Sequence, residues 1–287
     1  MNQIKSKLGI DKKTLFEMSI FLGISLSLTH YFIKEKITAS MFEVSGQVAP
    51  SKLAQYEKFI TTKQGDKIQI FEILGNPKSD KVLIVAPGIK GPFFHTDDFI
   101  LNSRDKFKTI VTLSYPTQGR SEGKISQKTM VSALQSLVNL YVKNPEKSSI
   151  ICASMGAIAC SHLKTDARTV FIHPALSSSQ VLQTFYDGYY DNINGSWVTT
   201  DDQSKVGLKE KLDLLLKNKW VARLVFPTSF TDFYYGARSP NLVYIPNKDE
   251  LARQEDLKRI FPNALSTGAN SHQDLGAKMS QKILDQL

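Results

Sequence analysis

The chain has 287 residues, of which 41% are hydrophobic and 22% are charged, and its formal net charge is +9. These values suit one globular domain of α/β size, or such a domain with a small insertion. A basic balance is compatible with nucleic acid, an anionic membrane or an acidic substrate as partner. Because the lysines are scattered and no basic block is interleaved with aromatic residues, we predict no nucleic-acid partner.

The only two cysteines are Cys152 and Cys160. The first lies at a predicted strand-to-helix turn and the second about two helical turns later, so we expect no disulfide between them. The spacing is not that of a zinc site either. We therefore predict neither a disulfide framework nor a metal or organic cofactor, a pattern that fits a reducing compartment.

The most apolar stretch is Leu15 to Ile33, with lysines on both sides. It is near the length that crosses a bilayer. A single-pass anchor, a secretory signal, and a helix lying on the membrane or on the domain are alternative interpretations. We predict an N-terminal apolar helix in 1–40 that associates with a membrane. Without that association the protein would be cytoplasmic. If the segment spans, the lysine excess before it places the remaining chain outside.

Apolar, β-branched runs predict the strands of the remaining segment, 41–287. Two paired strands come first, and helical spacing over Met130 to Val142 separates later runs. The alternation of strands and helices predicts an α/β fold with a mostly parallel sheet flanked by helices. The expected strands are Tyr56–Thr62, Lys67–Leu74, Lys81–Ala86, Thr109–Ser114, Ser148–Ala153, Thr169–His173 and Leu242–Ile245.

A long segment rich in aromatic residues, about 175–240, separates the last two expected strands. It includes Trp197, Trp220 and several tyrosines and phenylalanines. We predict that it is an insertion that caps the carboxyl edge of the sheet. The alternative is that it forms more of the domain core.

The stretch Cys152-Ala153-Ser154-Met155-Gly156 joins a predicted strand to a helix. It resembles the nucleophile elbow of α/β-hydrolases, G-x-S-x-G, with Cys152 in place of the first glycine. The small residues are needed because the strand and helix backbones nearly touch there. The resemblance implies that Ser154 is a nucleophile. The alternative is a strand-to-helix turn without chemistry.

In this fold the nucleophile is followed along the chain by an acid and then by a histidine. Of the five histidines, only His272 follows the last expected strand, so we predict that it is the base. Asp249 is the first acid after that strand and our choice to orient the histidine, with Glu250 as the alternative.

Backbone N–H groups must stabilise the oxyanion. The Met155 amide, directly after the nucleophile, is one expected donor. The other is the Ile89 amide in the loop Pro87-Gly88-Ile89-Lys90-Gly91, where Gly88 permits the turn.

The resemblance to the α/β-hydrolase superfamily extends from about Lys58 to the end of the chain. The segment Tyr115–Gly123 (YPTQGRSEG) is similar to the G-x-G-R-S-E-G segment of serine aminopeptidase-like and monoacylglycerol-lipase-like hydrolases. Pro87-Gly88 departs from the usual His-Gly. Short patches around Ser154, Asp249 and His272 are also similar to the bacterial acyl-transferase family that releases fatty acid from acyl-carrier protein.

Together these features predict a serine hydrolase with Ser154, Asp249 and His272 as its catalytic triad. The expected substrate is a small or lipid-like molecule with an apolar acyl group in ester or thioester linkage. One alternative is an aminopeptidase-like enzyme, in which Glu122 or Asp187 would hold the substrate amine. Another is a catalytically silent protein of the same fold that binds a ligand through the cap.

Overall fold

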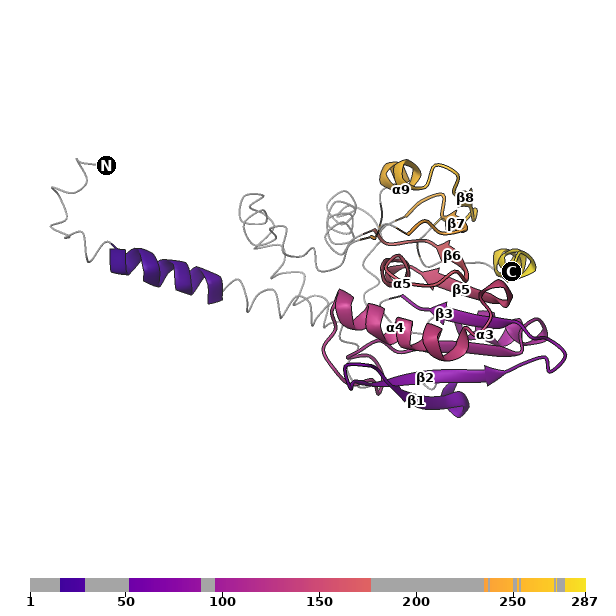
Figure 1. Cartoon of the computed structure of the whole chain (residues 1–287). Helices are drawn as coiled ribbons and strands as arrows, with labels where there is room; N and C mark the ends of the chain where they lie inside the picture. Colours follow the sequence, from indigo (N-terminus) through magenta and orange to yellow (C-terminus); the bar gives the residue numbers. More distant parts are fainter. Residues whose placement is uncertain are drawn as a thin grey trace, which may run out of the picture.

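An eight-stranded sheet forms the centre of the molecule (Figure 1). The computed structural model describes residues 16–28, 52–88, 96–176, 235–236, 238–249, 252, 254–270, 272 and 277–287. The strand order across the sheet is β1-β2-β4-β3-β5-β6-β7-β8. The strands are β1 (Glu57–Thr61), β2 (Lys67–Leu74), β3 (Val82–Ala86), β4 (Thr109–Leu113), β5 (Ser148–Ala153), β6 (Arg168–Ile172), β7 (Leu242–Ile245) and β8 (Leu265–Ser266).

The sheet is mostly parallel. β1 pairs with β2, and β2 with β4, in antiparallel register, and every later pairing from β4 to β8 is parallel. The β1–β2 hairpin closes through hydrogen bonds between Thr62 and Asp66 and between Gly65 and Thr62. Because the carboxyl ends of parallel strands meet at one edge, the described residues that directly follow β3, β5, β6 and β7 lie at the same edge of the sheet.

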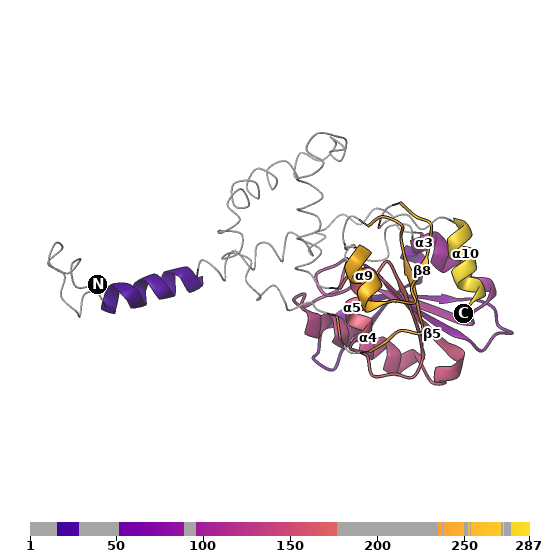
Figure 2. The ribbon, with the colours of Figure 1, turned by 90° about the horizontal axis from the view of Figure 1, so that it is seen from above.

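Helices cover both faces of the sheet, as the view from above shows (Figure 2). α4, α5 and α9 contribute to one buried apolar cluster, and α3 and α10 contribute to a second one. Ser126 caps the start of α4, since the Ser126 and Thr129 side chains each accept the other's backbone N–H in a capping box. The helices are α3 (Thr96–Asn102), α4 (Gln127–Tyr141), α5 (Met155–Cys160), α9 (Gln254–Ile260) and α10 (Ala277–Asp285), with 3₁₀ turns η1 (Ala54–Tyr56), η3 (Ser103–Asp105) and η4 (Pro145–Lys147).

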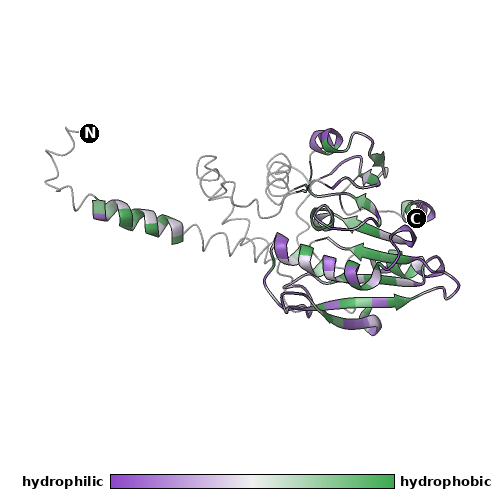
Figure 3. Ribbon diagram, in the orientation of Figure 1, coloured by the Kyte–Doolittle hydropathy of each residue, from purple (hydrophilic) through white to green (hydrophobic). Residues whose placement is uncertain are grey.

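Alternate residues of the central strands enter different clusters. On β3, Ile84 and Ala86 face the α4–α5 side, whereas Leu83 and Val85 face the α3–α10 side. Strands buried on both faces have no polar face, so they are hydrophobic along most of their length (Figure 3). This explains why continuous apolar runs located the central strands correctly.

The fold class predicted from the sequence is confirmed, and each bound of the seven expected strands is found within one residue of its predicted position. β8, α3 and α9 were not predicted, since β8 has only two residues and each of these helices has only seven. Most of the predicted cap, residues 177–234, lies outside the described residues.

The chain is helical over residues 16–28, within the predicted N-terminal apolar segment. Its large apolar side chains are exposed, among them Phe16 at 66% and Phe21 at 73%. Within the described part of the chain, no helix has both the length and the hydropathy needed to cross a bilayer.

Candidate active site

Ser154 occupies the sharp turn between β5 and α5. Its backbone has φ 51° and ψ −120°, a conformation that non-glycine residues rarely adopt. Main-chain hydrogen bonds hold it there. Its N–H donates to the Ile172 carbonyl of β6 at 3.0 Å, and its own carbonyl accepts from Ala157 at 3.0 Å and Ala175 at 3.1 Å. The central strands therefore hold a strained serine at the carboxyl edge of the sheet.

Gly156 allows α5 to approach β3 closely. A Cβ atom at this position would lie 2.4 Å from the Ala86 carbonyl oxygen and 2.7 Å from that of Pro87. Gly88 brings the loop after β3 to the serine, since a Cβ atom there would lie 3.1 Å from the Ser154 Cβ. The glycines thus allow the close contacts between backbone segments for which the elbow motif needs small residues.

The expectation that Cys152 and Cys160 remain unpaired is wrong. They form a disulfide across the elbow, with their Cα atoms 6.3 Å apart. Their spacing in the sequence alone suggested two positions separated by about two turns of one helix. Because the chain reverses at Ser154, α5 instead runs back beside β5 and brings the two cysteines together. A disulfide is typical of oxidising compartments, so the cysteines no longer favour a reducing one.

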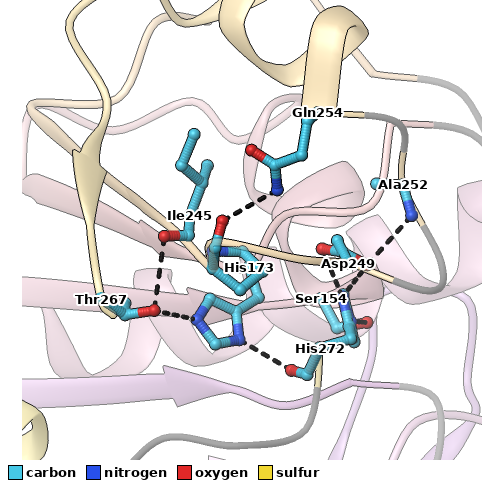
Figure 4. Close-up of polar contacts among 9 residues, drawn as sticks. Ser154, His173, Ile245, Asp249, Ala252, Gln254, Thr267 and His272 are labelled. Carbon is cyan, nitrogen blue, oxygen red and sulfur yellow. Dashed lines mark hydrogen bonds and ion pairs between the residues drawn. The ribbon is translucent and has the colours of Figure 1, made fainter. Parts of the chain in front are cut away.

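His272 and Asp249 meet Ser154 in a continuous hydrogen-bonded chain (Figure 4). The His272 Nε2 lies 2.8 Å from the Ser154 Oγ. The His272 Nδ1 lies 3.0 Å from Oδ1 and 2.9 Å from Oδ2 of Asp249. A carboxylate only accepts hydrogen bonds, so Nδ1 carries the proton and Nε2 is left to accept the Ser154 hydroxyl proton.

This chain of groups is shielded from water. The His272 side chain is 4% exposed and that of Asp249 is 0% exposed. Asp249 Oδ1 also accepts the Ala252 N–H at 3.0 Å. A buried carboxylate with these donors is held in one orientation, and it fixes both the tautomer and the direction of the histidine ring. The arrangement can generate a nucleophilic serine.

The loops that carry the acid and the histidine are joined by main-chain and side-chain hydrogen bonds. The Asn247 N–H donates to the Ala269 carbonyl at 2.7 Å, and the Ser266 hydroxyl donates to the Asn247 amide oxygen at 2.6 Å. The Gln254 side chain donates to the Pro246 carbonyl at 2.8 Å. These bonds hold Asp249 and His272, which are 23 positions apart in the sequence, at a fixed distance from each other.

Of the two expected oxyanion donors, Met155 begins α5 directly after Ser154 and is buried. Ile89 lies outside the described residues, as does Glu250, the alternative acid. Gly88, the residue before Ile89, is described and lies against the Ser154 side chain. The start of the predicted donor loop therefore adjoins the nucleophile.

The motif segment Tyr115–Gly123 follows β4 and is fastened to the antiparallel edge of the sheet. Gln69 on β2 is central to this attachment. Its N–H donates to the Ser121 hydroxyl at 2.9 Å, and its Oε1 accepts the Arg120 N–H at 3.0 Å. Arg120 also pairs with Glu57 at 2.5 Å. Glu122 is exposed, with its N–H donating to Lys67 on β2. Asp187 lies outside the described residues.

One residue at the site was not assigned a role from the sequence. His173 follows β6, is buried, and contacts the main chain of His272. The catalytic pattern of this fold requires only one histidine, and His272 already fills that position in chain order. A histidine directly after a core strand, at the same sheet edge as the nucleophile, was the available signal.

Neither a protein-family model nor a curated protein matches this chain. Solved structures do resemble it. An esterase of Pyrococcus furiosus is 18% identical and has a TM-score of 0.56, with 85% of this chain and 96% of that one covered. An α/β-hydrolase from Penicillium sp. sh18 is 14% identical, with a TM-score of 0.54 and coverage of 80% and 95%. An esterase from Exiguobacterium antarcticum is 12% identical, with a TM-score of 0.52 and coverage of 80% and 97%.

The chain covers almost the whole length of each of these structures. Identities this low show the fold alone. The strand order, the parallel register and the turn at Ser154 agree with that likeness. The chain has the fold of the α/β-hydrolase superfamily.

Proposed function

We propose that this protein is a serine hydrolase that cleaves ester or thioester bonds of substrates with an apolar acyl group. The observation that carries the proposal is the hydrogen-bonded chain Ser154–His272–Asp249 at a strained elbow, with its 2.8 Å contact between hydroxyl and imidazole. A structural role alone does not require a serine beside a buried histidine and aspartate side chain in this order and geometry.

In the proposed reaction, Ser154 Oγ attacks the substrate carbonyl carbon while His272 Nε2 takes the hydroxyl proton. Asp249 stabilises the resulting imidazolium through its contacts with Nδ1. The carbonyl π bond opens to an oxyanion, which the Met155 and Ile89 amides would stabilise. Its collapse expels the leaving group, which receives the proton from His272. Water then attacks the acyl-enzyme with His272 as base, which releases the acid and restores Ser154.

The proposed acyl preference is based on the composition of the predicted cap and on two resemblances. The predicted cap is rich in aromatic residues, and patches around the triad are similar to a fatty acyl-transferase family. Several solved structures with this fold are named esterases. Apolar acyl groups bind best to apolar, largely preformed pockets. We therefore propose medium or long acyl chains in preference to acetyl esters.

The decisive assay compares three substrate classes of matched acyl length: p-nitrophenyl esters, acyl thioesters and aminoacyl arylamides. The full-length protein and its Ser154→Ala variant are measured together. Turnover of esters or thioesters that is lost in the variant supports the proposal. Faster turnover of arylamides would favour the aminopeptidase alternative, and no turnover of any class would favour a silent binding protein.

We further propose that the N-terminal segment binds a lipid surface. The helix over residues 16–28 exposes apolar side chains on all sides, and lysines lie before and after it in the sequence. A helix without a polar face is normally buried in protein or lipid. Full-length protein should sediment with vesicles containing anionic lipid, and a Phe21→Asp/Ile24→Asp variant should not. Equal sedimentation of both would overturn this proposal.

A further inference from the structure

His173 lies between the central sheet and the loop that carries His272. It directly follows β6, its N–H donates to the Tyr244 carbonyl of β7 at 2.8 Å, and it is only 3% exposed. Its φ of 45° lies in the left-handed region, which few residues other than glycine, asparagine, aspartate and histidine adopt. The backbone at this point thus turns out of the sheet towards the active site.

The two ring nitrogens of His173 contact the loop that carries His272, as Figure 4 shows. The Nδ1 is 2.7 Å from the His272 carbonyl oxygen, and the Nε2 is 3.0 Å from the Thr267 hydroxyl. A carbonyl oxygen only accepts, so the Nδ1 of His173 must carry a proton and donate it. In the neutral ring the Nε2 then accepts the hydroxyl proton of Thr267 at 3.0 Å, in preference to the longer 3.3 Å contact between this hydroxyl and the Ile245 carbonyl oxygen.

Thr267 extends the attachment to the next strand. It directly follows β8, and its N–H donates to the Ile245 carbonyl at the end of β7 at 2.9 Å. His173 therefore joins the end of β6 to both the start of the histidine loop and the backbone of His272. The rings of His173 and His272 lie 5.9 Å apart, so His173 acts on the main chain of His272 and leaves its ring nitrogens to Ser154 and Asp249.

We propose that His173 is a positioning residue that fixes the backbone of His272, and through it the distance from the His272 Nε2 to the Ser154 Oγ. A loop that carries a base needs such a fixed point, because a displacement of about 1 Å at a reacting group can cost a factor of about 100 in rate. This inference rests on the proposed function, since positioning of His272 affects a rate only if His272 is the base.

Two substitutions of His173 by amide residues distinguish the effect of its hydrogen bond to His272 from the effect of its side-chain volume. In His173→Asn, the amide nitrogen can occupy the place of the Nδ1 and keep the donor to the His272 carbonyl, and asparagine tolerates the positive φ. In His173→Gln, the longer side chain places its amide nearer the position of the Nε2, so the contact with the His272 carbonyl is lost. Thr267→Val removes only the second contact. All three are made in the full-length chain.

We expect His173→Gln to lower kcat by about 10- to 100-fold with KM unchanged, because positioning acts on the chemical step. His173→Asn should retain most of the wild-type kcat, and Thr267→Val should lie between the two. Rates are expressed per folded active site, by circular dichroism and fluorophosphonate titration. Wild-type kcat in His173→Gln, or an equal loss in Asn and Gln, would overturn the proposal.

Failure of the proposed function gives a different result. If the wild-type protein turns over no acyl substrate, the low-field NMR resonance of the His272 Nδ1 proton still reports its contact with Asp249. Sharp signals in the wild type and His173→Asn, together with a broadened signal in His173→Gln, would still support positioning by His173. Identical signals in all three would contradict it.

Discussion

The nucleophile and its two partners are held in place by different means. Ser154 lies on one short segment at the centre of the sheet, fixed by β5, α5, close backbone contacts at Gly156 and a disulfide across the turn. Asp249 and His272 lie on separate loops near the sheet edge formed by β7 and β8, held by hydrogen bonds between loops. Main-chain hydrogen bonds and close packing within the central sheet therefore position the nucleophile, whereas hydrogen bonds between loops position the base.

This difference predicts which property, stability or turnover, each set of substitutions reduces. Changes at the elbow should reduce the stability of the fold, since the elbow is part of the core. Changes on the loops should reduce turnover while leaving the core intact, because the groups they move are held by individual hydrogen bonds.

Among substitutions that keep Ser154 and His272, the largest effect on turnover is expected for Asp249→Asn, which preserves the shape of the side chain but changes the tautomer of His272. Turnover should fall by about 10⁴-fold. The control is Asp256→Asn on α9, whose carboxylate pairs with Arg259 at 2.9 Å and lies outside the triad. The kcat of both variants is measured on the preferred ester. Wild-type turnover in Asp249→Asn, with loss in Glu250→Gln, would move the role of the acid to Glu250.

At the elbow, Gly156→Ala should lower the free energy of unfolding by about 3 kcal/mol or more, at the upper end of overpacking effects. The added methyl group would lie 2.4 Å from the Ala86 carbonyl oxygen, a backbone atom that cannot rotate away. Urea unfolding followed by circular dichroism measures the change. An unchanged midpoint would show that the strand and helix are not in this close contact.

Removal of the disulfide should have a smaller effect, and on stability alone. The Cys152→Ala/Cys160→Ala variant should lose about 2–3 kcal/mol, the value expected from the chain entropy of a short loop. Turnover should remain, since neither sulfur contacts Ser154 or His272 in the proposed reaction. Thiol titration of the unreduced, denatured wild type should find no free thiol. Two free thiols would contradict the cross-link.

The smallest effect is expected at Glu72 on β2, far from both regions along the sheet. Burial opposes ionisation of this carboxyl, but hydrogen bonds from Tyr141 and Lys58 hold its pKa below the ordinary value of 4.5. A lowered folded-state pKa stabilises the protein above the unfolded pKa, and this contribution is lost as pH falls through the folded value. The pair is partly exposed, so we expect less than about 1 kcal/mol.

The test for Glu72 is the difference in unfolding free energy between the wild type and Glu72→Gln from pH 7 downwards. The difference should shrink only below about pH 4.5, the ordinary carboxyl value. A difference in unfolding free energy that stays constant down to the pH at which the protein unfolds would contradict the lowered pKa of Glu72.

The same contrast explains what the sequence could predict. The central strands and Ser154 were located from local patterns, since buried parallel strands are continuous apolar runs and an elbow needs small residues within five positions. Asp249 and His272 were assigned only by their order after the last strand. Their mutual contacts, and the role of His173, depend on how loops 23 and 99 residues apart in sequence fold together. The disulfide was missed because its geometry depends on the chain reversal at Ser154.

The central claim is that Ser154 is an activated nucleophile served by His272. Its most direct test is labelling of the folded full-length protein with a fluorophosphonate, beside Ser154→Ala and His272→Ala. We predict stoichiometric labelling of the wild type, none of Ser154→Ala, and labelling of His272→Ala slowed by several orders of magnitude. Labelling that persists in Ser154→Ala, or its absence from a folded wild type, would contradict the claim.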